Sequence, residues 1–143
     1  GLFFIFFMRI IEAMRYLGID YGLKRIGIAV SDEDGRMAFP AGTIINRGGS
    51  STVCKDIAKK VKGEKVGCII VGLPMGLDSK ETEQTKITQG FIALLKKTIS
   101  IPVKTENEIL TSRMAVGSGM KGGHIDATSA AIILQSYLDK SNR

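Results

Sequence analysis

The sequence has few of the residues on which several classes of protein depend. Its 143 residues include two cysteines, one histidine, three prolines and no tryptophan. Cys54 and Cys68 have neither the spacing of a metal-binding motif nor the number that a disulfide framework needs, so we expect a reducing compartment, the cytoplasm. The apolar run at residues 2–8 is far shorter than the roughly 20 residues that span a membrane. It also lacks the basic segment and cleavage site of a signal peptide, so no membrane association is expected.

Acidic residues are outnumbered as well. The chain has 20 lysines and arginines against 14 aspartates and glutamates, a net charge of +6 and a pI near 9.4. This balance favours contact with polyanions, of which nucleic acid is the first candidate. Residues 1–13 contribute one charge of each sign, so the basic character belongs to the remainder of the chain.

The length corresponds to one domain with a core of its own. Residues 1–13 are dominated by an apolar stretch, and Met14 leads directly into the first predicted strand. We therefore expect residues 1–13 to be an extension outside the fold and residues 14–143 to form a single domain.

The chain is organised around residues 16–32, which predict two strands joined by a tight turn. β-branched and aromatic residues suit the strands, and Gly22 permits the turn. Asp20 lies where the first strand should end, and Lys24 and Arg25 follow in the turn. An acid held beside two cations suits a site that handles a metal and a phosphate. The alternative is that Asp20 only accepts hydrogen bonds from turn amides.

The remaining pattern predicts an α/β fold in which a mixed sheet is flanked by helices. An antiparallel three-strand meander is expected first, with a two-residue turn at Asp34-Gly35 and with Pro40 marking a bend or an edge. A continuously apolar segment then predicts a buried, central, parallel strand. The expected segments are a strand at 37–45, a helix from the serines after Gly49 to about Lys62, a strand at 66–72 and a loop at 73–77.

Helix boundaries were assigned from capping residues. Gly63 stands where a helix-ending glycine is expected, and Asp78 with Glu81 resembles a capping box for a helix that ends near Thr98. Further along, the pattern predicts a strand at 101–105 followed by residues 106–108, a short helix near Thr111, a glycine-rich loop at 117–123 and a last helix that begins at Asp126.

Three carboxylates fall where function gathers in such sheets, beyond the carboxyl ends of the strands. Asp20 ends the first strand, Glu108 follows the last strand, and Asp126 opens the last helix. Carboxylate oxygens are the ligands that Mg²⁺ prefers. Spacing alone does not establish that the three side chains meet.

Residues 18–32 resemble the opening signature of the YqgF (RuvX-like) family. Residues 71–74, 108–112 and 125–138 resemble its second, third and fourth motifs, so the resemblance covers essentially residues 14–139. The family has an RNase H-like fold. It is described both as a Holliday junction resolvase and as a nuclease that matures the 5′ end of small-subunit ribosomal RNA.

The resemblance implies a metal-dependent nuclease that hydrolyses phosphodiester bonds of structured nucleic acid. Processing of the 5′ end of pre-16S rRNA in ribosome biogenesis comes first, and Holliday junction resolution in DNA recombination is the alternative. Carried over by position, Asp20, Glu108 and Asp126 are the implied catalytic triad. The same residues are the implied ligands of Mg²⁺ or Mn²⁺ in a two-metal mechanism.

Four further residues are candidates for contact with nucleic acid. Lys24 and Arg25 are placed to meet phosphate, although charged turn residues are often only solvated. Tyr21 could stack on a base or pack beside the turn. Lys121 stands alone where the family has several basic residues. For Asp126 the competing role is that of a helix N-cap, and for His124 a surface position competes with proton transfer.

The sequence departs from the family pattern in three places. Asn107 and Ile109 flank Glu108 where the family usually has Asp and Arg, and Asp78-Ser79 stands where Asp-Gly is usual. The third is the glycine-rich stretch before Asp126. Asn107, Ile109 and this stretch motivate a second interpretation, a nucleic-acid-binding module whose catalytic site has decayed. Junction resolution would require a symmetric homodimer with two sites.

Overall fold

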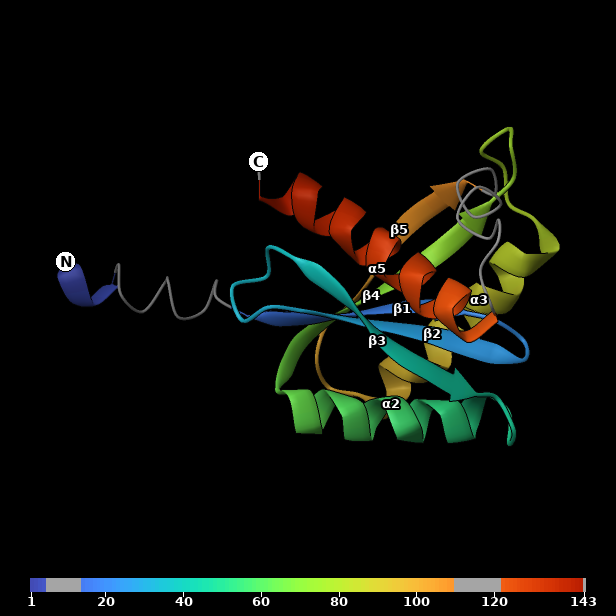
Figure 1. Cartoon of the computed structure of the whole chain (residues 1–143), viewed down its shortest axis with the longest axis horizontal. Helices are drawn as coiled ribbons and strands as arrows, with labels where there is room; N and C mark the ends of the chain where they lie inside the picture. The colour runs from blue at the N-terminus through green and yellow to red at the C-terminus, as the bar shows by residue number, and fades with distance from the viewer. Residues whose placement is uncertain (5–13, 110–121, 143) are drawn as a thin grey trace.

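The computed structural model of the protein describes residues 1–4, 14–109 and 122–142. In this part of the chain five strands form one sheet in the order β3-β2-β1-β4-β5 (Figure 1). The strands are β1 (Arg15–Tyr21), β2 (Arg25–Ser31), β3 (Ala38–Ile45), β4 (Val66–Met75) and β5 (Val103–Ile109). The helices are α2 (Ser50–Glu64), α3 (Glu83–Thr98) and α5 (Gly122–Ser141).

The sheet is mixed in the way that the sequence predicts. β1, β2 and β3 form an antiparallel meander, whereas β4 is parallel to both of its neighbours, β1 and β5. The continuously apolar segment thus lies inside the sheet, where both of its faces are covered. Pro40 lies on the edge strand β3, beside an irregularity in the pairing with β2, which agrees with its predicted role.

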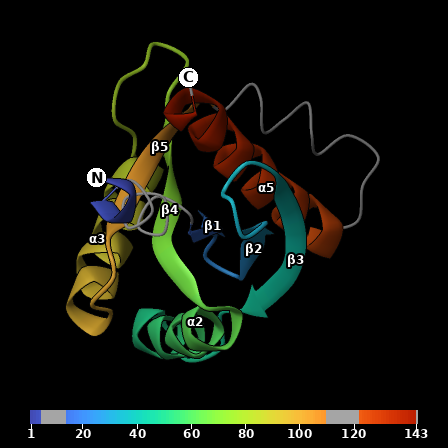
Figure 2. The same ribbon diagram turned by 90° about the vertical axis from the view of Figure 1, so that its left-hand side faces the viewer.

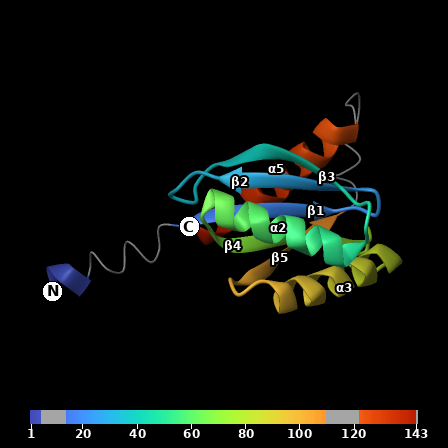
Figure 3. The ribbon, with the colours of Figure 1, turned by 90° about the horizontal axis from the view of Figure 1, so that it is seen from below.

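The helices cover the two faces of the sheet unequally. Helices α2 and α3 lie on one face and α5 crosses the other, as the end-on view in Figure 2 and the view from below in Figure 3 show. Two apolar cores result. The core under α2 and α3 takes alternate residues of the strands, among them Leu17, Ile19, Tyr21, Ile26, Ile28, Ile69 and Val71. The core under α5 contains Ala29, Cys68, Ile70, Ala130, Ile133, Leu134 and Leu138.

Glycines let α5 approach the sheet closely. A side chain at Gly18 would lie 2.7 Å from Cβ of Leu134, and one at Gly27 would collide with the main chain of Asp126. Gly72 lies under the side chain of Ile133 in the same way. The three glycines belong to three different strands, so the seat of the helix extends across the middle of the sheet.

The capping residues of α2 differ from the prediction. The N-cap is Gly49, which makes no side-chain cap hydrogen bond, so the serines do not cap the helix. The helix also passes through Gly63 and ends at Glu64, with Lys65 as its C-cap in a left-handed conformation with a φ of 56°. The prediction that Gly63 ends the helix was therefore wrong, because a lysine adopts the conformation that glycine usually supplies.

The start of α3 also lies elsewhere than predicted. Thr82 is the N-cap and forms a capping box with Thr85, so Asp78 and Glu81 do not have this role. The Thr85 hydroxyl donates a hydrogen bond to the carbonyl oxygen of Pro74, which ties the start of α3 to the end of β4. Instead, the Asp78 side chain accepts a hydrogen bond from the amide of Lys80 at 3.0 Å.

Two strands and one connection extend further than the sequence predicted. β4 continues through residues 73–75, which were predicted as loop, and β5 continues through residues 106–109. The connection between β2 and β3 spans residues 32–37 because the carboxylate of Asp32 accepts hydrogen bonds from the amides of Arg36 and Met37. These bonds lower the pKa of Asp32.

Some predictions fall outside the described residues. They are the helix near Thr111, the loop at 117–121 and residues 5–13 of the extension, so the division at residue 13 stays a prediction. Across the described ranges, no helix has both the length and the apolar character to cross a membrane. Cys54 and Cys68 are both buried and neither forms a disulfide, and burial raises the pKa of each thiol.

Replacing Gly27 tests the close seat of α5. We expect Gly27→Ala to lower the free energy of unfolding by about 3 kcal/mol, because a methyl group there must displace helix backbone. Gly90→Ala is the matched control, since Gly90 lies within α3 with open space around it. The control should raise stability by about 0.5–1 kcal/mol. Urea unfolding measures both, and equal stability of the two variants would contradict the close seat.

Candidate active site

Asp20 lies at the carboxyl end of β1 on the face that α5 covers. Leu17, Ile19 and Tyr21 point into the core under α2 and α3, so the alternation of the strand turns Asp20 to the opposite face. Only 3% of Asp20 is exposed. A carboxylate so deeply buried is costly unless polar or charged groups surround it, which makes its neighbourhood the first place to look for chemistry.

Glycines stand on both sides of Asp20 in the sheet. Gly27 on β2 is its direct partner, and Gly72 on β4 lies beside it because the preceding residues, Ile19 and Val71, are paired. Asp20 thus projects from a row of the sheet whose neighbouring positions have no side chains. The main chain of Asp126 lies over Gly27, and the side chain of Ile133 lies over Gly72.

Glu108 approaches Gly72 from the neighbouring strand β5. It lies within β5 and not after it, so the strand fixes its direction. Its Oε2 atom is 3.4 Å from the place that a Cβ of Gly72 would occupy. Asp20 and Glu108 therefore lie on the same face of the sheet, on either side of Gly72.

Asp126 reaches the site from α5. The helix begins at Gly122, so Asp126 lies inside it and the competing N-cap role was wrong. The main chain of Asp126 lies directly over Gly27, the partner of Asp20. Its carboxylate accepts a hydrogen bond from Nε of Arg25 at 2.9 Å, and the two side chains are 20% and 48% exposed.

The structure thus places Asp20 and Glu108 on the α5 face beside Gly72, and it places the main chain of Asp126 over Gly27. Within residues 1–4, 14–109 and 122–142, however, no three His, Cys, Asp or Glu side chains are arranged to hold a metal ion. The chemistry of the donor set nevertheless fits a divalent cation, since it consists of carboxylates, and Oε2 of Glu108 lies 3.4 Å from the Cβ position of Gly72, the residue beside Asp20. One of the three carboxylates, that of Asp126, is engaged by Arg25.

The predicted nucleic-acid contacts fare differently. Lys24, in the turn between β1 and β2, and Arg25, the first residue of β2, are both exposed. Tyr21 is only 5% exposed; its ring stacks on Phe91 and its hydroxyl is 2.8 Å from Oγ of Ser50. The packing alternative therefore describes Tyr21, and its ring is not presented to a base. Lys121 lies outside the described residues.

Glu106 is a further acid on this face that the sequence did not single out. It precedes Glu108 by two residues on β5, and its carboxylate accepts hydrogen bonds from Lys140 at 2.6 Å and Ser136 at 2.7 Å. These partners lie on α5, so Glu106 anchors the end of that helix to the last strand. A predicted strand that continued through residue 108 would have placed both glutamates on one face, because side chains alternate along a strand.

The structure accounts for two of the departures from the family pattern, those at Asn107 and Ser79. Asn107 is exposed and alternates with Glu108, so it points to the face away from Asp20. A carboxylate lost there leaves the three acids on the α5 face unchanged. Ser79 has a φ of 62°, a left-handed conformation that the usual glycine adopts without strain.

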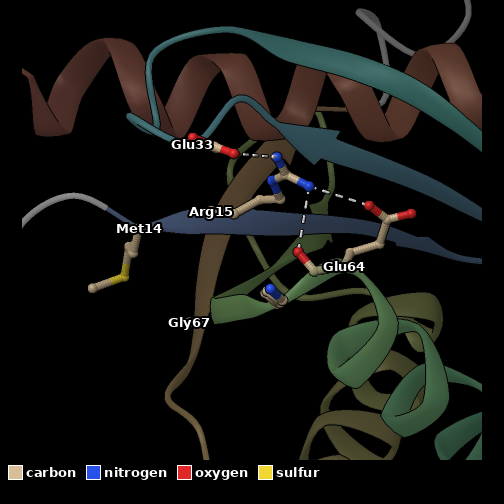
Figure 4. A pocket seen from close by; sticks show the side chains of 6 residues that line it. Met14, Arg15, Glu33, Glu64 and Gly67 are labelled. Carbon is tan, nitrogen blue, oxygen red and sulfur yellow. Dashed lines mark hydrogen bonds and ion pairs between the residues drawn. The ribbon is translucent and has the colours of Figure 1, made fainter.

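A hollow of about 300 Å³ lies at the opposite end of the sheet, lined by Met14, Arg15, Glu33, Glu64, Lys65 and Gly67. Figure 4 shows the guanidinium of Arg15 between Glu33 at 3.7 Å and Glu64 at 3.3 Å. These carboxylates neutralise the charge of Arg15. The hollow lies where β1 and β4 begin. The hollow is therefore separate from the carboxylates at the carboxyl ends.

Comparison with solved structures defines the class of fold. Thermus thermophilus RuvC in complex with a Holliday junction substrate aligns with a TM-score of 0.55 at 13% sequence identity, over 90% of this chain and 95% of RuvC. A second structure of Thermus thermophilus RuvC gives a TM-score of 0.56. The fold is accordingly RNase H-like, as the sequence predicted.

The family follows from comparison of sequences. The sequence profile of RuvX, described as a Holliday junction resolvase, matches residues 14–140. The chain belongs to the RuvX family. A relative from Maridesulfovibrio salexigens is 32% identical over 90% of this chain and 100% of the relative. Another, from Sulfurihydrogenibium sp., is 39% identical over 88% of this chain and 90% of its own length. Both carry the name "Putative pre-16S rRNA nuclease".

Replacing each of the two glutamates of β5 by glutamine distinguishes their roles. We expect Glu106→Gln to lower the free energy of unfolding by about 1–2 kcal/mol, because it weakens charged hydrogen bonds that hold α5. Glu108→Gln should cost less stability and abolish nuclease activity, whereas folded Glu106→Gln should retain it. Thermal unfolding and a cleavage assay on the same preparations measure both. The opposite pattern would exchange the roles assigned to the two residues.

Proposed function

We propose that the chain is a nuclease that hydrolyses phosphodiester bonds in structured nucleic acid and processes the 5′ end of pre-16S rRNA. The observation that carries the proposal is the position of Asp20 and Glu108 on the α5 face at the carboxyl ends of the strands, with the main chain of Asp126 over Gly27. Membership of the RuvX family supports it, because the profile of that family, described as a Holliday junction resolvase, matches residues 14–140.

Divalent cations are the proposed cofactor, with Asp20, Glu108 and Asp126 as the residues that would hold them. Bound Mg²⁺ or Mn²⁺ would supply an activated water and stabilise the charge of the leaving oxygen. The protein's own contribution is orientation. Asp20 is fixed by a buried strand, Glu108 by β5, and Asp126 by the helix seated on Gly27.

The mouth of the site is suited to phosphate. Lys24, in the turn between β1 and β2, and Arg25, the first residue of β2, are both exposed, so their cations lie where a nucleic-acid backbone would enter. Arginine and lysine bind phosphate through charge-assisted hydrogen bonds. In this arrangement the turn binds the substrate, and the carboxylates behind it direct the cleavage.

Pre-16S rRNA is proposed as the substrate because the relatives are named for it and the similarity covers nearly their whole length. A protein that acts on precursor rRNA works in the cytoplasm, where two reduced cysteines are expected. Holliday junction cleavage is the alternative that the description of the family names. It would require two copies of this site in a symmetric dimer.

The deciding experiment uses the full chain and its Asp20→Asn variant. Each is incubated with a labelled pre-16S rRNA fragment and with a four-way DNA junction, in Mg²⁺, in Mn²⁺ and in chelator. We expect cleavage of the RNA that depends on the cation, stops on addition of chelator and falls at least about 100-fold in Asp20→Asn, as for loss of a group that acts in the transition state.

The matched control is Asp34→Asn, which removes the same charge from an exposed turn at the other end of the sheet. It should cleave like the parent chain. Cleavage of the junction alone would reassign the substrate to branched DNA. Binding that depends on salt but gives no cleavage with either cation would establish the decayed binding module instead.

A further inference from the structure

The ion pair between Arg25 and Asp126 joins the two ends of the candidate site. Arg25 is the first residue of β2, and Asp126 lies 101 residues later on α5. Their side chains meet at 2.9 Å, and Arg25 remains 48% exposed at the mouth. The pair therefore lies at the border between the buried carboxylates and solvent.

Each partner is wanted elsewhere by the proposed reaction. The carboxylate of Asp126 is one of three acids that would hold a cation, and the guanidinium of Arg25 is one of two cations at the mouth that would bind phosphate. While the two are bonded to each other, neither has its full charge available. The pairing therefore competes with a cation for Asp126 and with phosphate for Arg25.

We propose that Arg25 is a positioning residue that holds Asp126 until a divalent cation displaces it and frees the guanidinium for the phosphate backbone. The inference rests on the proposed function. It makes the binding of cation and nucleic acid mutually reinforcing, because each removes one partner of the ion pair. By linkage, the cation must raise the affinity for nucleic acid by the same factor as nucleic acid raises the affinity for the cation.

The geometry favours exchange over a permanent structural pair. Half of the Arg25 side chain is exposed, and ion pairs in such positions contribute little to folding. A divalent cation has twice the charge of the guanidinium and prefers carboxylate oxygen. The main chain of Asp126 is held over Gly27 by packing, so the pair with Arg25 fixes only the direction of the carboxylate.

The first test measures binding of the cation alone. Mg²⁺ is titrated calorimetrically into the full chain and into Arg25→Gln, with thermal unfolding as a check that both are folded. Because Arg25 no longer competes for Asp126, we expect Arg25→Gln to bind Mg²⁺ on the order of fivefold more tightly, a coupling of the usual size. Arg36→Gln removes an exposed arginine at the far end of the sheet and should leave the affinity unchanged. Equal or weaker binding by Arg25→Gln would overturn the proposal.

The second test measures binding of nucleic acid without cleavage. A fluorescently labelled RNA hairpin is titrated at constant ionic strength in chelator and in Ca²⁺, which also takes oxygen ligands. In the parent chain, Ca²⁺ should raise the affinity on the order of fivefold. Asp126→Asn should bind the RNA more tightly than the parent chain in chelator, because Arg25 is already released, and should gain less from Ca²⁺. Weaker binding by Asp126→Asn in chelator would contradict the proposal.

The two proposals fail in different ways. A parent chain that neither cleaves nor binds RNA refutes the proposed function, and the calorimetric comparison still shows whether Arg25 competes with the cation. A parent chain that cleaves RNA while Arg25→Gln binds Mg²⁺ no more tightly refutes only the exchange.

Discussion

Helix α5 can lie directly against the sheet because the strand positions beneath it are glycines. A side chain at Gly18, Gly27 or Gly72 would meet atoms of the helix, so the packing distance depends on these three residues. Interiors packed at this density transmit small changes in volume to their surroundings. The rest of the site inherits its geometry from this contact, because Asp126 lies on the helix and Asp20 between two of the glycines.

The site is consequently a property of layers and not of loops. Asp20 and Glu108 are held by strands, whose alternation decides the face on which they lie, and Asp126 is held by a helix. Glu106 fastens the far end of that helix through Lys140 and Ser136. Rigid elements suit a reaction in which carboxylates must keep fixed positions while a charged substrate arrives.

The sheet was predictable because it depends on periodicity, whereas the element ends were not. Apolar alternation and the continuous apolar run before Gly72 identified the strands and their order along the chain. The ends depend on which of several similar residues caps a helix: Lys65 took a left-handed conformation beside an available Gly63, and Thr82 displaced Asp78. The glycine row was equally hidden, since the role of Gly27 exists only once α5 is seated on it. Motif resemblance supplied the three acids, and the structure added Glu106 and the ion pair of Asp126.

The wide separation of Asp20 and Asp126 along the chain has a consequence for biosynthesis. The first acid leaves the ribosome early, but α5 can be seated only after every strand has been made, since its contacts reach from β1 to β5. Contacts between residues so far apart form late in folding, because the intervening chain must be ordered first. A growing chain therefore holds an incomplete set of acids, and it acquires the whole set only when the last helix closes over the sheet. An enzyme whose proposed substrate is ribosomal RNA would in this way remain inert while it is still attached to a ribosome.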